Sequence, residues 1–311
     1  MLNFLRARNN SNYYVTFALR RASLHIVVVE RGNENTPSLV VCDDVTVQEG
    51  DANTALRQLA HKYAKYCRHN PPVTLVLGIG YYQSVALDRP NLEPHELAAS
   101  LRYSLRDLVS YEPEDCIADY YELPIQLAGQ NKINAIAASK SELSSILQAI
   151  HDVSDNIVAV LSEEQAVAEM FKVHEEPTVV AYQQPEQAAL LQVYRSGQMQ
   201  VNRAVRSLEQ LHKLTLDEIR MGGLQPLSVE VQRSGDYFER QLRQSPIRQI
   251  ILALSLPKQD EVLASLRDDL GLPVEWASYP NWAQELAAGD YSDFAAIGGA
   301  VATLKLCEAQ T

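Results

Sequence analysis

Two segments about half a chain apart carry the same pattern of strands, and this repeat restricts the possible folds most strongly. The first segment, 15–30, has two β-rich runs on either side of a polar turn at 20–23. The second segment, 178–203, has an additional strand and then the same arrangement around Ser196-Gly197. Runs of β-branched and aromatic residues on either side of a short polar turn predict β-hairpins. Two such hairpins predict a duplicated α/β fold with a cleft between its halves.

Length, composition and charge narrow the class of protein further. The 311 residues predict about two domains, and a hydrophobic content of 46% is enough for two sizeable cores. The formal net charge is −12, and the sequence pI is about 5.1. Because an acidic chain repels phosphate backbones, we expect no nucleic-acid partner and no broad basic face for anionic lipids.

The apolar runs and the cysteines indicate a cytosolic protein. The longest apolar runs, 24–29 and 250–256, are the length of strands, whereas a membrane-spanning helix needs roughly 20 apolar residues. We therefore expect no direct membrane span, and residues 1–12 lack the apolar core of a secretory signal. The four cysteines are scattered without a Cys-x-x-Cys pair, which predicts reduced thiols rather than disulfides or a zinc site.

Periodicity predicts where the main helices lie. Apolar residues recur with helical spacing over 53–67, 139–151, 227–243 and 291–306, and 207–216 is also predicted to be helical.

The motifs of common active sites are absent from the sequence. Gly78-Ile79-Gly80 follows a predicted strand, but the third position of a dinucleotide fingerprint is Gln83, so a turn between two strands is expected. No phosphate-binding P-loop, zinc-protease motif or nucleophile elbow occurs. Acidic residues occur in adjacent pairs such as Glu163-Glu164, and adjacent side chains point apart. These pairs are therefore expected on solvated faces, and no metal site is expected.

Three further segments narrow the range of protein families that the sequence can resemble. Residues 229–241 read Val-Glu-Val-Gln-Arg-Ser-Gly-Asp-Tyr-Phe-Glu-Arg-Gln, 158–170 read as a helix that ends a first domain, and 295–302 form an Ala- and Gly-rich helix. Together with the hairpins, these segments resemble the actin-like ATPase superfamily, most closely its pilus-assembly branch, the PilM type. The length and the 229–241 helix are most similar to the members found in mannose-sensitive haemagglutinin (MSHA-type) pilus systems.

The resemblance implies an α/β fold of the actin-like, ribonuclease H-like duplicated kind. It implies domain I at 1–175 with a small inserted α+β subdomain at about 73–139, and domain II at 176–293. It also implies that the helix at 294–311 packs back toward domain I.

An ATPase of this superfamily needs an Asp near the end of the first strand of each hairpin, glycine and hydroxyl residues in the turns, and a late Gly-Gly turn. The Asp helps to hold Mg²⁺, and the turns let backbone N–H groups approach the phosphates and adenosine. Other residue types occupy these positions here: Ala18, Arg20, Arg21 and Ser23 in the first hairpin, Gln183 and Pro185 in the second, and Ser255, Leu256 and Pro257 after the late strand.

These departures predict a degenerate nucleotide cleft, no hydrolysis and no cofactor. Arg20 and Arg21 could still pair with an anion, which leaves weak ATP binding open. One alternative is therefore an actin-like protein that binds ATP as a structural or sensing ligand. A second, a sugar-kinase-type phosphotransferase, would require an Asp in the first turn and a general base.

The role implied by the resemblance is that of a non-catalytic scaffold, held at the cytoplasmic face of the inner membrane by its partners. The expected partner is a bitopic pilus assembly protein that offers a cytoplasmic peptide, and the pilus assembly ATPase could be a second partner. The resemblance places peptide docking near the inserted subdomain. The candidate docking residues there are Tyr81, Tyr82, Leu97, Leu101 and Tyr103.

Overall fold

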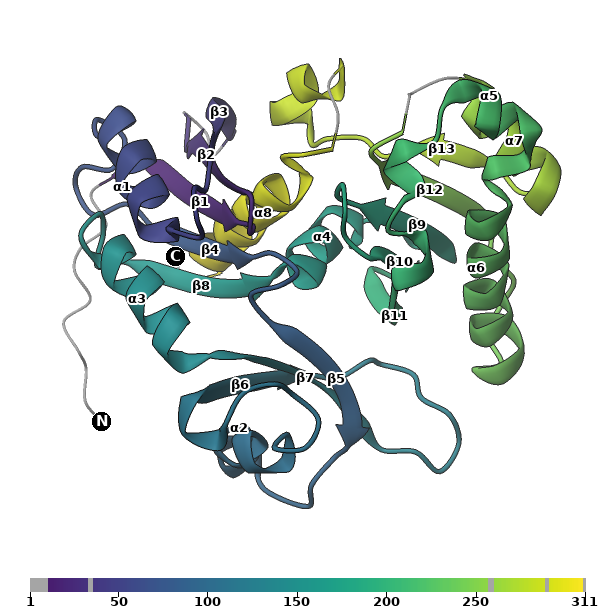
Figure 1. Ribbon diagram of the computed structural model, residues 1–311, viewed down its shortest axis with the longest axis horizontal. Coiled ribbons are helices and arrows are strands. Elements are labelled where there is room, and N and C mark those ends of the chain that lie inside the picture. Colours follow the sequence, from purple (N-terminus) through teal and green to yellow (C-terminus); the bar gives the residue numbers. More distant parts are fainter. Residues whose placement is uncertain (1–10, 33–35, 257–259, 289–290, 310–311) are drawn as a thin grey trace. The chain divides into compact units, whose positions relative to one another are not determined.

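The computed structural model describes residues 11–32, 36–256, 260–288 and 291–309 (Figure 1). The chain divides into two compact units. Unit 1 comprises Met1–Glu122, Lys132–Glu169 and Ala295–Thr311, and unit 2 comprises Leu123–Asn131 and Met170–Phe294. Within the described ranges, no helix combines the length and apolarity that crossing a bilayer requires.

Unit 1 is built on a five-stranded mixed sheet with the strand order β3-β2-β1-β4-β8. Strands β1 and β2 form the antiparallel hairpin predicted from the sequence, and β1 also pairs in parallel with β4. The strands are β1 (Tyr13–Leu19), β2 (Ser23–Glu30), β3 (Ser38–Thr46), β4 (Val73–Leu77) and β8 (Ile157–Ser162).

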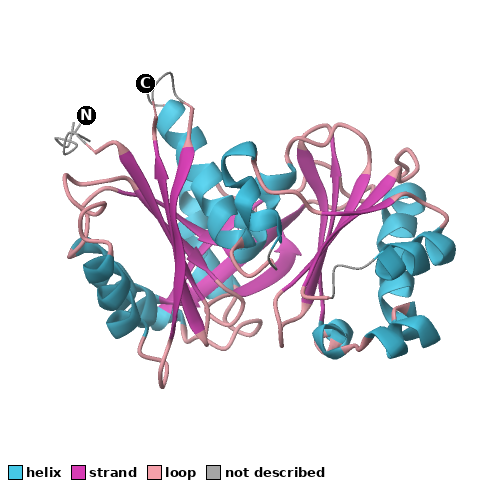
Figure 2. Cartoon of the chain, turned by 90° about the horizontal axis from the view of Figure 1, so that it is seen from above, coloured by secondary structure: helices cyan, strands magenta, loops and turns pink. Residues whose placement is uncertain are grey.

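Helices cover both faces of this sheet (Figure 2). Alternate β1 residues such as Phe17 enter one core with α1 (Ala52–Lys62) and α3 (Lys140–His151). Thr16 faces the other way, toward α8 (Phe294–Glu308), because a Cβ on Gly299 of that helix would lie 2.8 Å from the Thr16 methyl carbon. The period-2 alternation of β1 thus serves two cores.

Unit 1 also contains a separate three-stranded sheet with the strand order β5-β7-β6. Its strands are β5 (Gln83–Asp88), β6 (Cys116–Tyr121) and β7 (Lys132–Ser139), and α2 (Pro94–Ser104) packs against it. A short 3-10 turn, η2 (Pro113–Asp115), leads into β6. The turn at 78–80 separates β4 from β5, as the sequence predicts.

Unit 2 repeats the sheet plan of unit 1, with the strand order β11-β10-β9-β12-β13. Its strands are β9 (Thr178–Gln183), β10 (Ala189–Arg195), β11 (Gln198–Val205), β12 (Gln249–Leu254) and β13 (Val274–Trp276). The predicted turn between β10 and β11 is confirmed, and Ser196 and Gly197 both adopt positive φ, at 51° and 69°. Paired positive φ values fit the right-handed twist of a hairpin.

One face of the unit 2 sheet packs on α6 (Gln225–Asp236) and α7 (Asp260–Leu270). The other face carries an aromatic cluster that includes Tyr182, Tyr291 and Phe294. Helix α4 (Glu163–Phe171) belongs to unit 1 as far as Glu169, and its last two residues belong to unit 2. The helical segments that complete unit 2 are η3 (Arg206–Leu208), η4 (Leu211–Lys213), α5 (Leu216–Glu218), η5 (Ile219–Gly223), η6 (Tyr237–Gln241) and η7 (Asn281–Ala288).

Two helix predictions need correction in unit 2. Residues 207–216 form two separate 3-10 turns, η3 and η4, rather than one α-helix. The helix predicted over 227–243 is α-helical only to Asp236 and then continues as the π-helix η6. Apolar spacing alone does not distinguish a regular helix from its tighter or wider variants.

Candidate functional site

The turn of the first hairpin is the part of the molecule where the resemblance expects a bound phosphate. Ala18 is buried in β1, opposite His25 of β2. The turn is closed by the Arg20 N–H, which donates to the Ser23 carbonyl at 2.8 Å. The Ser23 hydroxyl in turn lies 3.0 Å from His25 Nε2.

Arg20 turns its side chain into the protein rather than toward solvent. Its Nε lies 3.3 Å from a carboxylate oxygen of Glu163, and its Nη1 lies 3.2 Å from His25 Nε2. Arg20 is 6% exposed and Glu163 is fully buried. Buried charges persist only when they are paired and hydrogen-bonded, so the two side chains stabilise each other in this position.

Glu163 connects the hairpin turn to the turn after β4. Its second carboxylate oxygen accepts a hydrogen bond from the Ile79 N–H at 3.0 Å. The Gly78 N–H donates to the Leu19 carbonyl at 2.7 Å. A Cβ on Gly78 would lie 2.8 Å from that same oxygen, so this close approach requires glycine. The ends of β1 and β4 and the start of α4 are therefore joined around one ion pair.

Arg21 is also occupied, although it lies at the surface. Its guanidinium donates to the Glu142 carboxylate at 2.7 Å and to the Gly80 carbonyl at 2.5 Å. It also lies 3.9 Å from the centre of the Tyr81 ring, within the range of a cation–π contact. The anion-binding role suggested for Arg20 and Arg21 would require both arginines to exchange these partners.

Two observations at this turn argue against Mg·ATP binding. The Arg20 and Gly78 N–H groups are committed to backbone carbonyls, whereas phosphate binding needs free N–H groups that point toward the ligand. Among the described residues, no group of three or more His, Cys, Asp or Glu side chains could hold a metal ion.

The corresponding turn of unit 2 is likewise filled by its own side chains. Gln183 is buried, and its amide donates to the carbonyls of Gln187 and Leu208 at 2.9 and 2.5 Å. Pro185 is exposed in the following turn. Of the late-turn residues, Ser255 is partly exposed, Leu256 is buried in the unit 2 core, and Pro257 lies outside the described residues.

Most of the candidate docking residues belong to the interior. Leu97 and Leu101 are fully buried between α2, to which they belong, and the small sheet, and Tyr81 and Tyr82 are 2% and 7% exposed. Their proposed contact with a partner is therefore corrected, because a peptide cannot reach side chains that already pack in a core. Tyr103 is the exception, with 62% of its surface exposed.

The burial of Glu163 and Glu164 was not predicted from the sequence. Glu163-Glu164 was expected on a solvated face, but the two residues are 0% and 3% exposed. Glu164 accepts hydrogen bonds from Ser84 and from the Tyr121 hydroxyl. The position of the pair at the start of a helix, directly after a buried strand, is the sequence signal that could have indicated burial.

The sequence and the fold of the chain were compared with those of known proteins. No family model matches the sequence, and no curated protein matches it significantly. Among solved structures, the PilM–PilN type IV pilus biogenesis complex matches with a TM-score of 0.63 and 16% identity, covering 94% of this chain and 98% of the other.

A protein from Bacteroides thetaiotaomicron with an actin-like ATPase fold matches with a TM-score of 0.54 and 12% identity, covering 97% and 99% of the two chains. The chain has an actin-like fold. The cytoplasmic domain of EpsL, an inner-membrane component of the Vibrio cholerae type II secretion system, matches with a TM-score of 0.52 and 14% identity, covering 93% and 94%. At these identities the likeness establishes the fold.

Proposed function

We propose that the protein is a non-catalytic scaffold of a type IV pilus machine, an MshI-like protein of an MSHA-type system. It works in the cytoplasm, peripheral to the inner membrane, where it is held by its partners. Support comes from the similarity to the pilus protein PilM and to the EpsL cytoplasmic domain. We retain the domain limits of 1–175 and 176–293 as part of this proposal.

The observation that carries the non-catalytic role is the buried pair of Arg20 and Glu163. This pair places a guanidinium and a carboxylate of the protein itself at the hairpin turn, where an actin-like ATPase would accommodate phosphate and metal. Binding a nucleotide there would leave a buried charge without its partner, which typically costs about 3–5 kcal/mol. In this proposal the fold serves to present surfaces that bind partner proteins.

The proposed partner is a bitopic inner-membrane pilus assembly protein, which docks through its cytoplasmic peptide. The PilM–PilN complex gives a precedent for partner binding by a protein of this fold. The small sheet of unit 1 and its flanking segments expose Tyr103, Leu108 and Ile117, with exposures of 62%, 52% and 47%. These side chains are available for the contact that the buried leucines cannot make. The pilus assembly ATPase is a second partner in this proposal.

A synthetic peptide tests the docking proposal directly. Its sequence would be the N-terminal cytoplasmic segment of the bitopic assembly protein encoded beside this chain, and its binding would be measured by calorimetry. We expect binding, and we expect Tyr103→Ala to weaken it about tenfold or more, as aromatic anchors do. Met221→Ala, which truncates an exposed side chain of unit 2, should leave it unchanged. No binding by the correctly folded protein would refute the docking proposal.

A further inference from the structure

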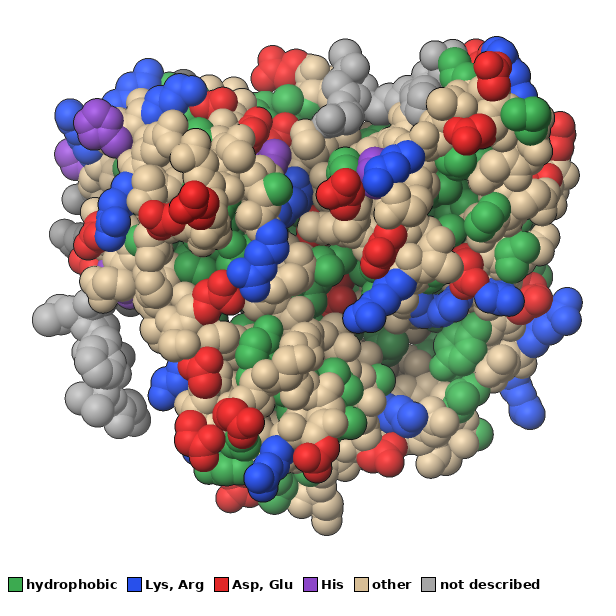
Figure 3. Space-filling model, viewed as in Figure 1, with side chains coloured by type: hydrophobic (Ala, Val, Ile, Leu, Met, Phe, Trp, Pro, Cys, Tyr) green, Lys and Arg blue, Asp and Glu red, His purple; other side chains and the backbone are tan. Residues whose placement is uncertain are grey.

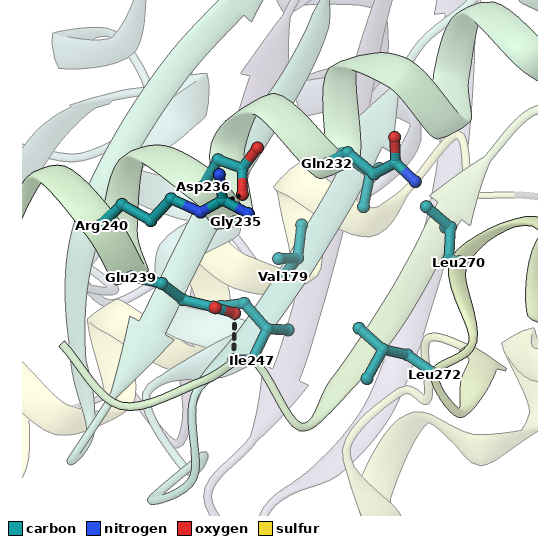
Figure 4. A pocket seen from close by; sticks show the side chains of 10 residues that line it. Val179, Gln232, Gly235, Asp236, Glu239, Arg240, Ile247, Leu270 and Leu272 are labelled. Atoms are coloured by element: carbon teal, nitrogen blue, oxygen red, sulfur yellow. Dashed lines mark hydrogen bonds and ion pairs between the residues drawn. The ribbon is translucent and has the colours of Figure 1, made fainter.

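Unit 2 contains a groove that the proposed docking surface of unit 1 does not involve. It has a volume of about 340 Å³ and lies between α6 and η6, the segment just before β12, and the turn from α7 to β13 (Figure 4). Its apolar lining consists of Val179, Val231, Ile247, Leu270 and Leu272. This volume is at the lower end of the range of binding pockets and suits one or two large apolar side chains.

The charged residues on the helix side of the groove are paired with one another or with the backbone. The Glu239 carboxylate accepts a hydrogen bond from the Ile247 N–H at 2.8 Å, and Arg240 lies 3.2 Å from Asp236 (Figure 4). Glu230, further back on α6, pairs with Arg203 and Arg233. Arginines thus offset the charges of Glu230 and Asp236, and the Glu239 carboxylate is held by the backbone.

The segment that carries the family resemblance forms this wall of the groove. Gln232, Gly235, Asp236 and Glu239 all line it. A Cβ on Gly235 would meet its nearest neighbour, a side-chain carbon of Ile247, at an ordinary 3.5 Å. Sterics therefore do not require glycine inside this helix, where alanine would be more favourable. Because Gly235 has no side chain, it leaves this part of the groove open.

The helix backbone departs from regular geometry where it borders the groove. The π-helix η6 includes Glu239 and Arg240, and such insertions occur frequently at functional sites. Arg243, two residues after η6, adopts a φ of 56°, which is unfavourable for a residue with a Cβ. The residue ends the helix here, where the Gln244 N–H donates to the Phe238 carbonyl at 3.3 Å, and a left-handed residue is common at such an end.

Arg243 and Arg248 lie on either side of the groove-lining Ile247 in the sequence. Residues 225–250 contain four arginines and three carboxylates, in a chain whose net charge is −12. Arg243 and Arg248 are exposed and form no ion pair with any described residue. Lys and Arg side chains gather near α6 on the face shown in Figure 3. Charge complementarity therefore favours an acidic occupant.

We propose that this groove is a docking site for an acidic segment of a partner protein, which inserts an apolar side chain between Ile247 and Leu272. Acidic residues next to the anchor would pair with Arg243 and Arg248. A short segment that combines a hydrophobic anchor with flanking charges is a common form of peptide recognition. This inference does not depend on the pilus assignment, because it rests on unit 2 alone.

A peptide selection with counter-selection tests the proposal. Random 12-residue peptides displayed on phage are selected on the full-length protein, and clones that also bind the groove-filled variant Gly235→Leu are removed. We expect the remaining clones to carry a large apolar residue flanked by Asp or Glu. Clones that do not distinguish the two proteins, or that are enriched in Lys and Arg, would overturn the proposal.

Substitution of the two arginines then tests the charged component of binding for a selected peptide. Arg243→Asn suits the positive φ but removes the charge, and together with Arg248→Gln it should weaken binding about tenfold. Arg57→Gln, at an exposed position of α1, is the matched control and should have no effect. Gly235→Ala reports whether α6 tolerates substitution in thermal unfolding. A concentration-dependent dimer that Gly235→Leu abolishes would assign the groove to a second copy and also overturn the proposal.

Discussion

Arg20 and Glu163 are 143 residues apart in sequence, and their side chains meet at 3.3 Å in the interior of unit 1. Because Glu163 also accepts the Ile79 N–H, the pair joins the hairpin turn to the ends of β4 and β8. In an actin-like ATPase these turns would have to accommodate a nucleotide. Here they are joined by a contact within the protein.

Removing one member of this pair is predicted to destabilise the protein strongly. Arg20→Met keeps most of the apolar stem but leaves Glu163 buried without its counter-charge. We expect it to lower the free energy of unfolding by about 3–5 kcal/mol, measured by urea denaturation.

Two further variants separate the charge effect from a general loss of packing. The double variant Arg20→Met/Glu163→Leu should recover much of the lost stability, since no unpaired charge remains. Arg57→Met, at an exposed arginine, should change stability by less than about 0.5 kcal/mol. If Arg20→Met behaved like the Arg57 control, the ion pair would not hold these turns together.

Two glycines within helices are predicted to respond oppositely to alanine. A Cβ on Gly298 of α8 would lie 2.0 Å from the Ala166 carbonyl oxygen, so α8 would have to move away from α4. We expect Gly298→Ala to cost about 3 kcal/mol or more in thermal unfolding. Gly235→Ala meets no such contact and should stabilise by about 0.5–1 kcal/mol through helix propensity. Equal effects at the two positions would contradict the packing of α8.

The Cys67 thiol is predicted to react slowly in the folded protein. Burial raises the pKa of Cys67 from 9.0 to about 11. Because the thiolate is the reactive form, iodoacetamide at pH 8 should alkylate Cys67 about 100-fold more slowly in the native than in the unfolded chain. Peptide mass spectrometry measures both rates.

The pH dependence of the alkylation rate distinguishes a raised pKa of Cys67 from steric shielding of its thiol. The native rate should keep rising above pH 9 toward pH 11, where the unfolded chain has already reached its plateau. Folding favours the neutral thiol, so its contribution to stability is complete below pH 9 and is lost as the pH rises toward 11. A native rate that reaches its plateau near pH 9 would show an ordinary pKa behind a steric barrier.

Much of the fold could be predicted because it depends on local patterns. The hairpins of both units follow from β-rich runs and short turns. The helix predicted over 139–151 is observed as α3, where the Ser139 hydroxyl caps the first turn by accepting the Glu142 N–H at 3.1 Å. The departures from regular helix in 207–216 and η6 could not be predicted, since tertiary packing determines them.

The site was harder to predict than the fold because it depends on contacts between distant residues. The absence of Asp and Gly from 13–30 and from 178–195 was visible in the sequence, but the partner of Arg20 was not. Leu97 and Leu101 lie on a helical stripe that fits equally a core and a docking face, and only the packing of α2 on its small sheet resolves this. The groove beside Gly235 requires residues from β9, α6 and the turn after α7.

Isothermal titration with Mg·ATP and with ADP tests most directly the central claim that the protein's own side chains occupy the nucleotide position. The measurement uses the full-length protein, with its folded state checked by thermal unfolding. We predict no saturable binding of either nucleotide at concentrations up to about 1 mM, where a complex would be worth only about 4 kcal/mol. A dissociation constant below about 10 µM, roughly −7 kcal/mol, would contradict it.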